Sequence, residues 1–405
     1  MNIYFYISER IRRGNKGSFS AIVSVIATTT IALGICVLML SFSVLEGFKR
    51  EIRKKIFSLA SHIQVRLSDN NESYEENPVP LNTEFYKNWR NDRGIEHVQI
   101  FCHKAGLLHT KKEVQGVVMK GVGDDYDVEK VKYAIVEGNF LNIRSNQVLR
   151  DIVVSKQIAR KMMIKTGDSV IMFFVQDPPK FRKLNVIGIY DTGLEEFDNH
   201  IIFGDIKLIR QINNWPDTLA GGYEIFLKDY KKMDDYYDII NGAINFDMVA
   251  ELVVDRYPQI FEWLSLLDRN VLVFWVLILA VCCFNMVSSI FIMIMERTPM
   301  IGSLKAFGAT NLQVQSIFLF NGLTIILRGL LLGNLIGLLL CYVQYQFKII
   351  PLNPENYYMN HVPIHWDVYA ILALNLLIFF VTLLILCIPV MFISYIKPVK
   401  SIKFC

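Results

Sequence analysis

The sequence is short of charge, and the shortage is concentrated in four runs that contain no charged residue. Only 20% of its 405 residues are Asp, Glu, Lys or Arg. The uncharged runs are Gly17–Leu45, Asn270–Met295, Gly329–Phe347 and Val368–Ile396. Because about 20 apolar residues in a helix cross a bilayer core, three of these runs are long enough alone. The third becomes long enough when it is joined to Val314–Leu327 across Arg328.

These runs predict an α-helical polytopic membrane protein. The four transmembrane helices are expected at 19–45, 269–295, 314–347 and 368–396. A helix satisfies its own backbone hydrogen bonds in lipid, whereas buried core helices, the less favoured alternative, are usually shorter. The first run exceeds the apolar core of a cleaved signal peptide and has no small-x-small site directly after it, so we expect it to remain as an anchor.

The motifs of common catalytic and cofactor sites are also absent. The sequence has no G-x-x-x-x-G-K-[ST] phosphate loop, no H-E-x-x-H and no G-x-S-x-G. His361 and His365 are four residues apart, but Pro363 between them disfavours the helix that would aim both at one metal ion. We therefore expect a non-catalytic chain that binds no metal and no cofactor of its own.

Paired cysteines and a strong net charge are missing as well. Of the seven cysteines, only Cys102 lies in the long segment between the first and second predicted spans, so we expect no disulfide within that segment. The formal net charge of +4 is too weak to indicate a nucleic acid partner.

Basic residues in short segments indicate which ends face the cytoplasm. Nine of them lie in the segments 1–18, 296–310 and 397–405: Arg10, Arg12, Arg13, Lys16, Arg297, Lys305, Lys397, Lys400 and Lys403. The 348–367 segment carries only Lys348 and is expected to be a short periplasmic loop. We therefore expect both termini in the cytoplasm. Basic residues after the first span argue against this, but long domains translocate largely regardless of charge.

Residues 46–268 are expected to form a large α+β extracytoplasmic domain inserted between the first two spans. Its first residues, LEGFKREIRKKIFSL, and the stretch from Ile260 to Leu267 carry apolar stripes at helical spacing. These stripes predict that the first two helices continue past the membrane as a paired stalk. The alternative is two amphipathic helices inside the domain.

The middle of this segment mixes strand and helix patterns. Alternation of apolar and polar residues predicts strands at 62–67, 183–190 and 223–227. A strand at 151–154 is followed by a helical pattern at 155–163. The acidic stretch Asp69–Pro80 is expected to be a flexible loop.

Glycines recur at every fourth residue in the third span, at Gly329, Gly333 and Gly337, with Gly322 on nearly the same face. Small residues at this spacing let helices approach closely in lipid. The pattern predicts a helix–helix seam, either inside one chain or between two chains.

Arg328 lies about 20 Å along the third span from Val314, near the middle of the membrane. A charge at this depth is costly and usually faces protein or water. We expect Arg328 to line an internal cavity and meet an anionic or carbonyl-rich cargo, or to bond a carbonyl within the bundle.

The order of segments, one span, a large outer domain and then three spans, resembles the permeases of lipoprotein-releasing ABC transporters in the FtsX-like and macrolide-exporter-like (MacB-like) superfamily. The resemblance covers essentially the whole chain. It rests on the motifs SVLEGFKREIRKKI, IVEGNFL, IVVSKQIARKMMIKTGDSV, MERTPMIGSLKAFGAT and IPVMFISYIKPVKSIKF.

The resemblance implies that residues 296–310 form a cytoplasmic coupling helix, seated in a groove of a separate ATPase. Met300, Ile301, Leu304 and Phe307 fall at helical spacing and would supply an apolar docking face. Glu296, Arg297, Lys305 and Gly308 would complete the contact. The alternative is a plain connecting turn.

The resemblance further implies a complex in the bacterial inner membrane, built from two permeases and an ABC ATPase dimer. The second permease would be another copy or a paralogue. The complex would take lipoprotein cargo from membrane lipid and pass it to a periplasmic carrier, with mechanotransmission from ATP hydrolysis. Expected cargo contacts are Phe42, Leu45, Phe48, Leu264, Leu267 and Arg328.

Some members of this family hook the carrier with a protruding hairpin. The matching place here is FVQDPPKF, with Pro178 and Pro179 at its tip, and it is short for such a hook. Three alternatives remain open from sequence: an efflux permease of the macrolide-exporter type, a signalling permease that regulates a cell-wall hydrolase, and a sensor subunit that moves nothing. The macrolide exporters carry their ATPase fused before the first span, whereas the first span is expected close to the start here.

Overall fold

The computed structural model describes residues 19–69, 74–111, 113–142, 147–353 and 357–395. The predicted segments 1–18 and 397–405 lie outside these residues. Internal contacts divide the chain into two units. The helical unit comprises Met1–Lys49, Trp263–Pro351 and His361–Cys405, and the sheet unit comprises Arg50–Glu262 and Leu352–Asn360.

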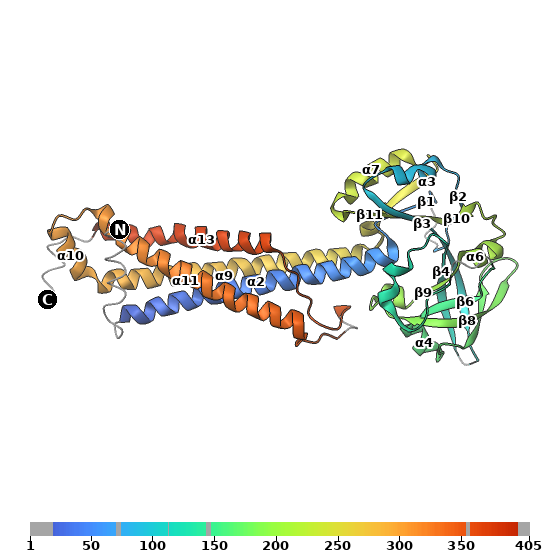
Figure 1. The fold of residues 1–405 in the computed structure, drawn as a ribbon, viewed down its shortest axis with the longest axis horizontal. Coiled ribbons are helices and arrows are strands. Elements are labelled where there is room, and N and C mark those ends of the chain that lie inside the picture. The colour runs from blue at the N-terminus through green and yellow to red at the C-terminus, as the bar shows by residue number, and fades with distance from the viewer. Residues whose placement is uncertain (1–18, 70–73, 112, 143–146, 354–356, 396–405) are drawn as a thin grey trace. The chain divides into compact units, whose positions relative to one another are not determined.

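The helical unit is a bundle of long helices (Figure 1). Its helices are α2 (Phe19–Ala60), α9 (Pro258–Glu296), α10 (Thr298–Ala306), α11 (Asn311–Phe347) and α13 (Val368–Met391). All of these except α10 are long and apolar enough to cross a membrane. Both α2 and α9 extend without a break beyond the spans expected at 19–45 and 269–295.

The glycine seam of α11 lies against α2 of the same chain. A Cβ atom added to Gly329 would lie 2.7 Å from Ile31, and one added to Gly333 would lie 1.8 Å from Ile35. Gly337 meets Met39 in the same way. Only glycine permits this approach, so the seam serves packing inside the chain. Gly322 has a different neighbour, because its added Cβ would meet Leu386 of α13.

The α2 and α9 helices pair through several side chains of the helical unit. Near the middle of α2, Gly34 leaves room for Cys282. Further along, the rings of Phe48 and Trp263 meet edge to face with centroids 5.5 Å apart. Lys49 Nζ then lies 2.8 Å from Asp268 Oδ1. Two helices that begin and end the same insertion are thus joined by apolar, aromatic and ionic contacts.

The sheet unit is built on one mixed, ten-stranded sheet. Its strands are β1 (Ile63–Leu67), β3 (Ile95–His109), β4 (Val114–Val122), β5 (Ile135–Gly138), β6 (Asp151–Ser155), β7 (Ser169–Phe174), β8 (Lys180–Tyr190), β9 (Ile201–Asp205), β11 (Gly222–Leu227) and β12 (Met248–Leu252). A separate pair joins β2 (Val79–Pro80) to β10 (Leu219–Ala220). The short helices are α3 (Glu84–Asn88), α4 (Lys156–Met162), α5 (Glu195–Asp198), α6 (Ile206–Asn213), α7 (Met233–Ala243) and α8 (Val253–Arg256).

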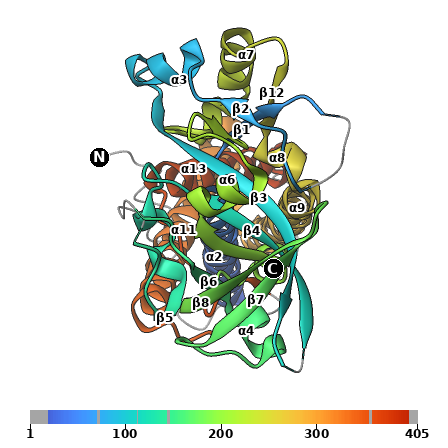
Figure 2. The same cartoon turned by 90° about the vertical axis from the view of Figure 1, so that its right-hand side faces the viewer.

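Part of this sheet closes on itself. Pairing runs from β3 through β4, β9, β6 and β8 to β7, and β7 returns to β3. Figure 2 shows these strands curving around a common interior. Closure leaves fewer unpaired strand edges. The β12, β1 and β11 strands extend the sheet from β3.

The strands predicted at 62–67, 151–154, 183–190 and 223–227 and the helix predicted at 155–163 are all present, as β1, β6, β8, β11 and α4. The described part of Asp69–Pro80, expected to be a flexible loop, is a loop up to the short strand β2, and its acidic side chains are bonded to the sheet. Glu76 accepts a bond from the His103 backbone N–H, and Glu75 binds Lys104 at 2.7 Å. The acidic residues hold this segment against the sheet because Glu76 binds the buried His103 and Glu75 binds the buried Lys104.

The segment between α11 and α13 also differs from a simple loop, since Leu352–Asn360 group with the sheet unit. Lys55, near the end of α2, donates to the carbonyl oxygens of Thr192, at 2.7 Å, and Tyr358. One ammonium group therefore joins three distant stretches of the chain.

His62 is a buried histidine at the start of the sheet. Its Nδ1 accepts the Leu227 backbone N–H at 3.1 Å, and its ring centroid lies 4.3 Å from that of Phe57. Burial, reinforced by the nearby charge of Lys130, lowers the pKa of His62 to about 4. The folded protein therefore holds this side chain neutral.

Replacing Gly333 with leucine should destabilise the helical unit by about 1–3 kcal/mol, because the added atoms must displace Ile35 or the α2 backbone. Thermal unfolding in detergent measures the change. Leu335→Ala, on an exposed part of α11, is the control and should leave unfolding nearly unchanged. Equal melting of the Gly333 variant and the wild type would contradict the close packing.

The His62 pKa predicts a loss of stability as the pH falls from 6.5 to about 4. Between these pH values His62 binds a proton in the unfolded chain but not in the folded chain. This difference lowers the free energy of unfolding by about 3 kcal/mol when it is complete. His62→Asn keeps an acceptor for Leu227 and removes the titration, so unfolding monitored against pH should show a shallower slope. His109→Asn, at an exposed position, is the control and should keep the wild-type slope.

Candidate functional site

The predicted coupling segment forms a short helix. Pro299 lies in the first turn of α10, where its missing N–H costs nothing. Gly308, at a φ of +92°, follows the end of the helix. Thr310 and Gln313 then form a capping box that starts α11. The connection between α9 and α11 is therefore a defined helix rather than a plain turn.

The apolar stripe of α10 faces inward. Ile301 is fully buried in the core of the bundle, and Met300 and Leu304 pack against that core. The expected docking face therefore requires correction at Ile301, which the bundle covers, whereas Met300 and Leu304 are half-buried and their docking role stays a prediction. Amphipathic spacing showed that one side of α10 is buried, but the bundle itself covers that side.

The outward surface of α10 and of the residues that flank it is formed by other side chains. Glu296, Pro299, Ser303, Ala306 and Gly308 are exposed, Arg297 is half-buried, and Phe307 is 91% exposed. Lys305 donates to the Ile393 carbonyl at 2.6 Å, which ties α10 to the segment after α13. An exposed aromatic ring on a helix anchored from beneath is a suitable contact for a separate protein.

The expected cargo residues on α2 and α9 divide into two groups. Phe48 and Leu264 are buried, and Phe48 packs on Trp263, so both hold the helices together. Phe42 lies 6.1 Å from the Trp275 ring and, like Leu45 and Leu267, is half-buried. The expectation of direct cargo contact is therefore wrong for Phe48 and Leu264, because side chains inside a packed pair have no free surface.

The apolar surface that α9 leaves exposed was not anticipated. Its residues include Leu266, Leu272, Val273, Phe274, Val276, Leu277, Val281, Phe284, Phe291 and Met295. Such a face is suited to acyl chains, to lipid or to another membrane helix.

Arg328 is exposed on α11, next to the exposed residues Leu327 and Leu331. Its side chain therefore faces outward from this chain, and the expectation that it meets an anionic or carbonyl-rich cargo stays a prediction. Because the glycines at 329, 333 and 337 bring one face of α11 against α2, the neighbouring Arg328 is turned away from that contact. Its cation is available to a group outside the chain.

The predicted carrier hairpin is the β7–β8 hairpin, with Pro178 and Pro179 exposed at its bend. Phe173 pairs in register with Phe181 on one side and with Leu107 of β3 on the other. All three side chains are exposed, and Val175 extends the patch. We call Leu107, Phe173, Val175 and Phe181 the hairpin patch. The sequence SVIMFFV indicated this patch. Successive strand residues point to opposite faces of the sheet, and here both faces carry apolar side chains, so those on the outer face stay exposed.

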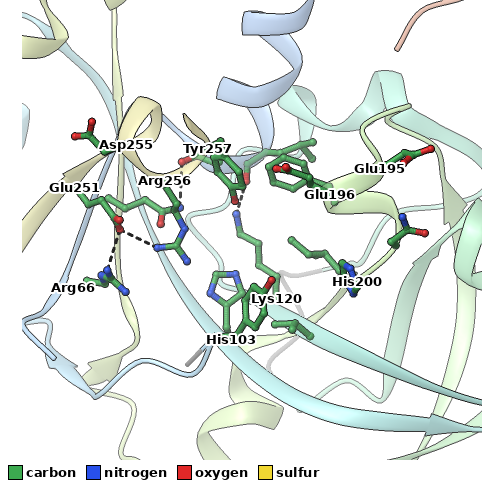
Figure 3. Close-up of a pocket in the computed structure, with 18 of the residues that line it drawn as sticks. Arg66, His103, Lys120, Glu195, Glu196, His200, Glu251, Asp255, Arg256 and Tyr257 are labelled. Atoms are coloured by element: carbon green, nitrogen blue, oxygen red, sulfur yellow. Dashed lines mark hydrogen bonds and ion pairs between the residues drawn. The ribbon is translucent and has the colours of Figure 1, made fainter. Parts of the chain in front are cut away.

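A half-open polar pocket of about 730 Å³ lies in the sheet unit (Figure 3). Its charged and aromatic lining includes Arg66, His103, Lys120, Glu195, Glu196, His200, Glu251, Asp255, Arg256 and Tyr257. Glu251 accepts from Arg256 at 3.1 Å and lies 3.3 Å from Arg66. Burial alone would raise the pKa of Glu76, but the charge and hydrogen bonds of His103 lower it, so this carboxylate stays ionised.

Lys120 and Glu224 form the most deeply buried ion pair beside this pocket, at 2.5 Å. Both lie within apolar strands, VQGVVMKGV and GYEIFL, and both are almost completely buried. Sequence reasoning missed this pair. The available signal was one opposite charge in each of two otherwise apolar strands, but nothing local shows that those strands enclose a common interior.

Comparison with known proteins follows the same division. The MacB-like periplasmic core domain family matches residues 24–234, and the FtsX-like permease C-terminal family matches residues 272–398. The lipoprotein-releasing system transmembrane protein LolC of Neisseria meningitidis is 22% identical over 379 residues, 87% of each chain. LolE of Haemophilus influenzae is 24% identical over 408 residues, covering 92% of this chain and 93% of that one.

LolC of Haemophilus influenzae is also 24% identical, over 355 residues and 83% of each chain. These relatives span the helices and the inserted domain alike, as the resemblance in the sequence predicted. The chain belongs to the FtsX-like permeases with a MacB-like periplasmic core domain, and within them it is LolC/LolE-like.

Proposed function

We propose that this chain is the permease subunit of an ABC transporter that extracts lipoproteins from the inner membrane and passes them to a periplasmic carrier. The observation that carries the proposal is the match to lipoprotein-releasing LolC and LolE proteins over nearly the whole chain, domain and helices together. The efflux, signalling and sensor alternatives receive less support from these relatives.

The chain lies in the bacterial inner membrane, crosses it four times and keeps both termini in the cytoplasm. Its sheet unit faces the periplasm. Its partners are a cytoplasmic ABC ATPase dimer, a second permease and the lipoprotein cargo. The ATPase supplies the nucleotide site and the magnesium ion, and the permease itself has no catalytic role. The basic residues of the short cytoplasmic segments support this orientation.

Lipoprotein extraction requires both an apolar route and an energy source. Each CH₂ group moved out of lipid costs about 0.8 kcal/mol, so several acyl chains cost tens of kcal/mol together. The exposed apolar face of α9 supplies a surface on which acyl chains remain covered. ATP hydrolysis on the partner supplies the work that moves them.

The α10 helix receives this work. Phe307 extends from its outward surface, while Ile301 and the Lys305–Ile393 bond fix its inner side to the bundle. A force applied to Phe307 and its neighbours therefore acts on α9, α11 and α13 together. This arrangement supports mechanical coupling, since α10 cannot yield independently of the helices that it joins.

The hairpin patch supports recruitment of the carrier by this chain. An exposed apolar row on a sheet is suited to binding another protein. The proline-containing bend is too short to act as a long hook, so the contact made here is a flat one on β3, β7 and β8.

Depletion of the protein should cause lipoproteins to accumulate in the inner membrane, as measured by membrane fractionation. The wild type should restore sorting. Phe307→Asp should not, because a charge on this exposed ring removes the apolar contact with the ATPase. Phe246→Asp, at an equally exposed phenylalanine of the sheet unit, is the matched control and should restore sorting. Normal lipoprotein sorting after depletion would disprove the proposed function.

The carrier contact is tested by a pull-down with the purified periplasmic carrier. Phe173→Ser combined with Phe181→Ser should weaken retention about tenfold, because two central apolar contacts are lost. Pro178→Ala with Pro179→Ala should have a smaller effect, since the patch remains. Phe246→Ser serves as the control. Undiminished retention of the double phenylalanine variant would exclude the hairpin patch as the carrier site.

A further inference from the structure

The end of α2 is held by side chains of the sheet. The last carbonyl groups of a helix have no partner within it and need one elsewhere. Here Lys120 Nζ of β4 donates to the Leu59 carbonyl at 2.6 Å, and Gln64 Nε2 of β1 donates to the Ala60 carbonyl at 3.2 Å. A cation at a helix C-terminus also complements the helix dipole.

Glu224 of β11 joins these donors into one buried network. Its carboxylate accepts from Lys120 at 2.5 Å, from Gln64 at 3.2 Å and from Gln99 of β3 at 2.7 Å. The Lys120 side chain is 4% exposed, and that of Glu224 is fully buried. One carboxylate thus connects the end of α2 with strands β1, β3, β4 and β11.

The network lies at the end of α2, beside the polar pocket of the sheet unit. Leu59, Ala60, Gln64 and Lys120 all border the 730 Å³ pocket and are themselves buried, so the network closes the pocket at the helix end. At this point the polar bonds add a directed connection between helix and sheet to the apolar packing of Ile56 and Leu59. In Figure 3, Lys120 extends across the pocket toward the end of α2.

Stability alone does not account for a buried ion pair in this position. Replacing such a pair with apolar residues of similar volume is often neutral or stabilising, because both charges pay a large desolvation cost. The pair instead fixes the orientation of the α2 end relative to the sheet, since charge-assisted hydrogen bonds require a defined geometry. The α2 helix is continuous from Phe19 to Ala60, so a displacement of its end acts directly on Lys120.

We propose that Lys120 and Glu224 are positioning residues that transmit displacement of α2 to the periplasmic sheet during transport. This inference rests on the proposed function and adds to it the joint through which the membrane helix moves the outer domain. Both side chains are buried inside the sheet unit. Their role is to make helix and sheet move as one body.

The test is the double variant Lys120→Met with Glu224→Gln, which removes both charges and nearly preserves volume. It is assayed in the full complex with the ATPase, in proteoliposomes that contain a lipoprotein. ATP hydrolysis should stay within about twofold of the wild type, while lipoprotein released per ATP falls about tenfold. Lys120→Arg, which keeps a cation at this position, should retain most of the coupling.

The matched control is Lys104→Met with Glu75→Gln. This pair also buries its lysine, at 2.7 Å from its carboxylate, but it links β3 to the Tyr74–Asn77 segment instead of to α2. The control should keep the wild-type ratio of lipoprotein to ATP. An equal loss of coupling in both double variants would show a general stability effect and overturn the proposal, and so would an unchanged ratio in the Lys120/Glu224 variant.

Gln64→Leu provides a second route if the double variant does not assemble. It cuts the bond to the Ala60 carbonyl and leaves the ion pair in place, so coupling should fall about threefold. An unchanged ratio in that variant would then overturn the proposal. Failure of the proposed function is distinguishable, because in that case the wild-type complex would itself release no lipoprotein.

Discussion

The pairing of α2 with α9 is the interaction on which the rest of the structure depends. These helices begin and end the inserted domain, and each carries a membrane stretch and a polar extension in one unbroken run. Their contact uses a glycine for close approach, an aromatic pair at Phe48 and Trp263, and an ion pair at Lys49 and Asp268. Some apolar residues that the sequence suggested for cargo binding, such as Phe48 and Leu264, therefore pack between α2 and α9 instead.

In both units, single polar side chains connect separate segments of the chain. In the helical unit, Asn334 and Asn375 bond each other across α11 and α13, where lipid offers no alternative partner. In the sheet unit, the Lys55 ammonium group joins the carbonyl oxygens of Thr192 and Tyr358, and that of Lys120 joins the Leu59 carbonyl oxygen to the Glu224 carboxylate. Such bonds fix geometry more than they add stability, which suits a protein that transmits force.

Three surfaces of the chain are suited to three different contacts. The α10 helix is anchored by its apolar side and presents Phe307 outward, the exposed α9 face can cover acyl chains, and the hairpin patch offers an apolar row to a soluble partner. Each surface belongs to an element whose other side is packed. A force applied to one of these surfaces therefore acts on the packed body of the protein and not on a loose segment.

The sequence by itself determined the four apolar helices, the α+β insertion, the main strands and the family, because local periodicity and ordered motifs report burial directly. Only the tertiary structure decided which neighbour covers each buried face. Ile301 turned out to face the chain's own core, Arg328 to face away from it, and Glu76 to bind His103. The Lys120–Glu224 pair was hidden for the same reason, since spacing along a chain shows that a side chain is enclosed but not which distant strand or helix end encloses it.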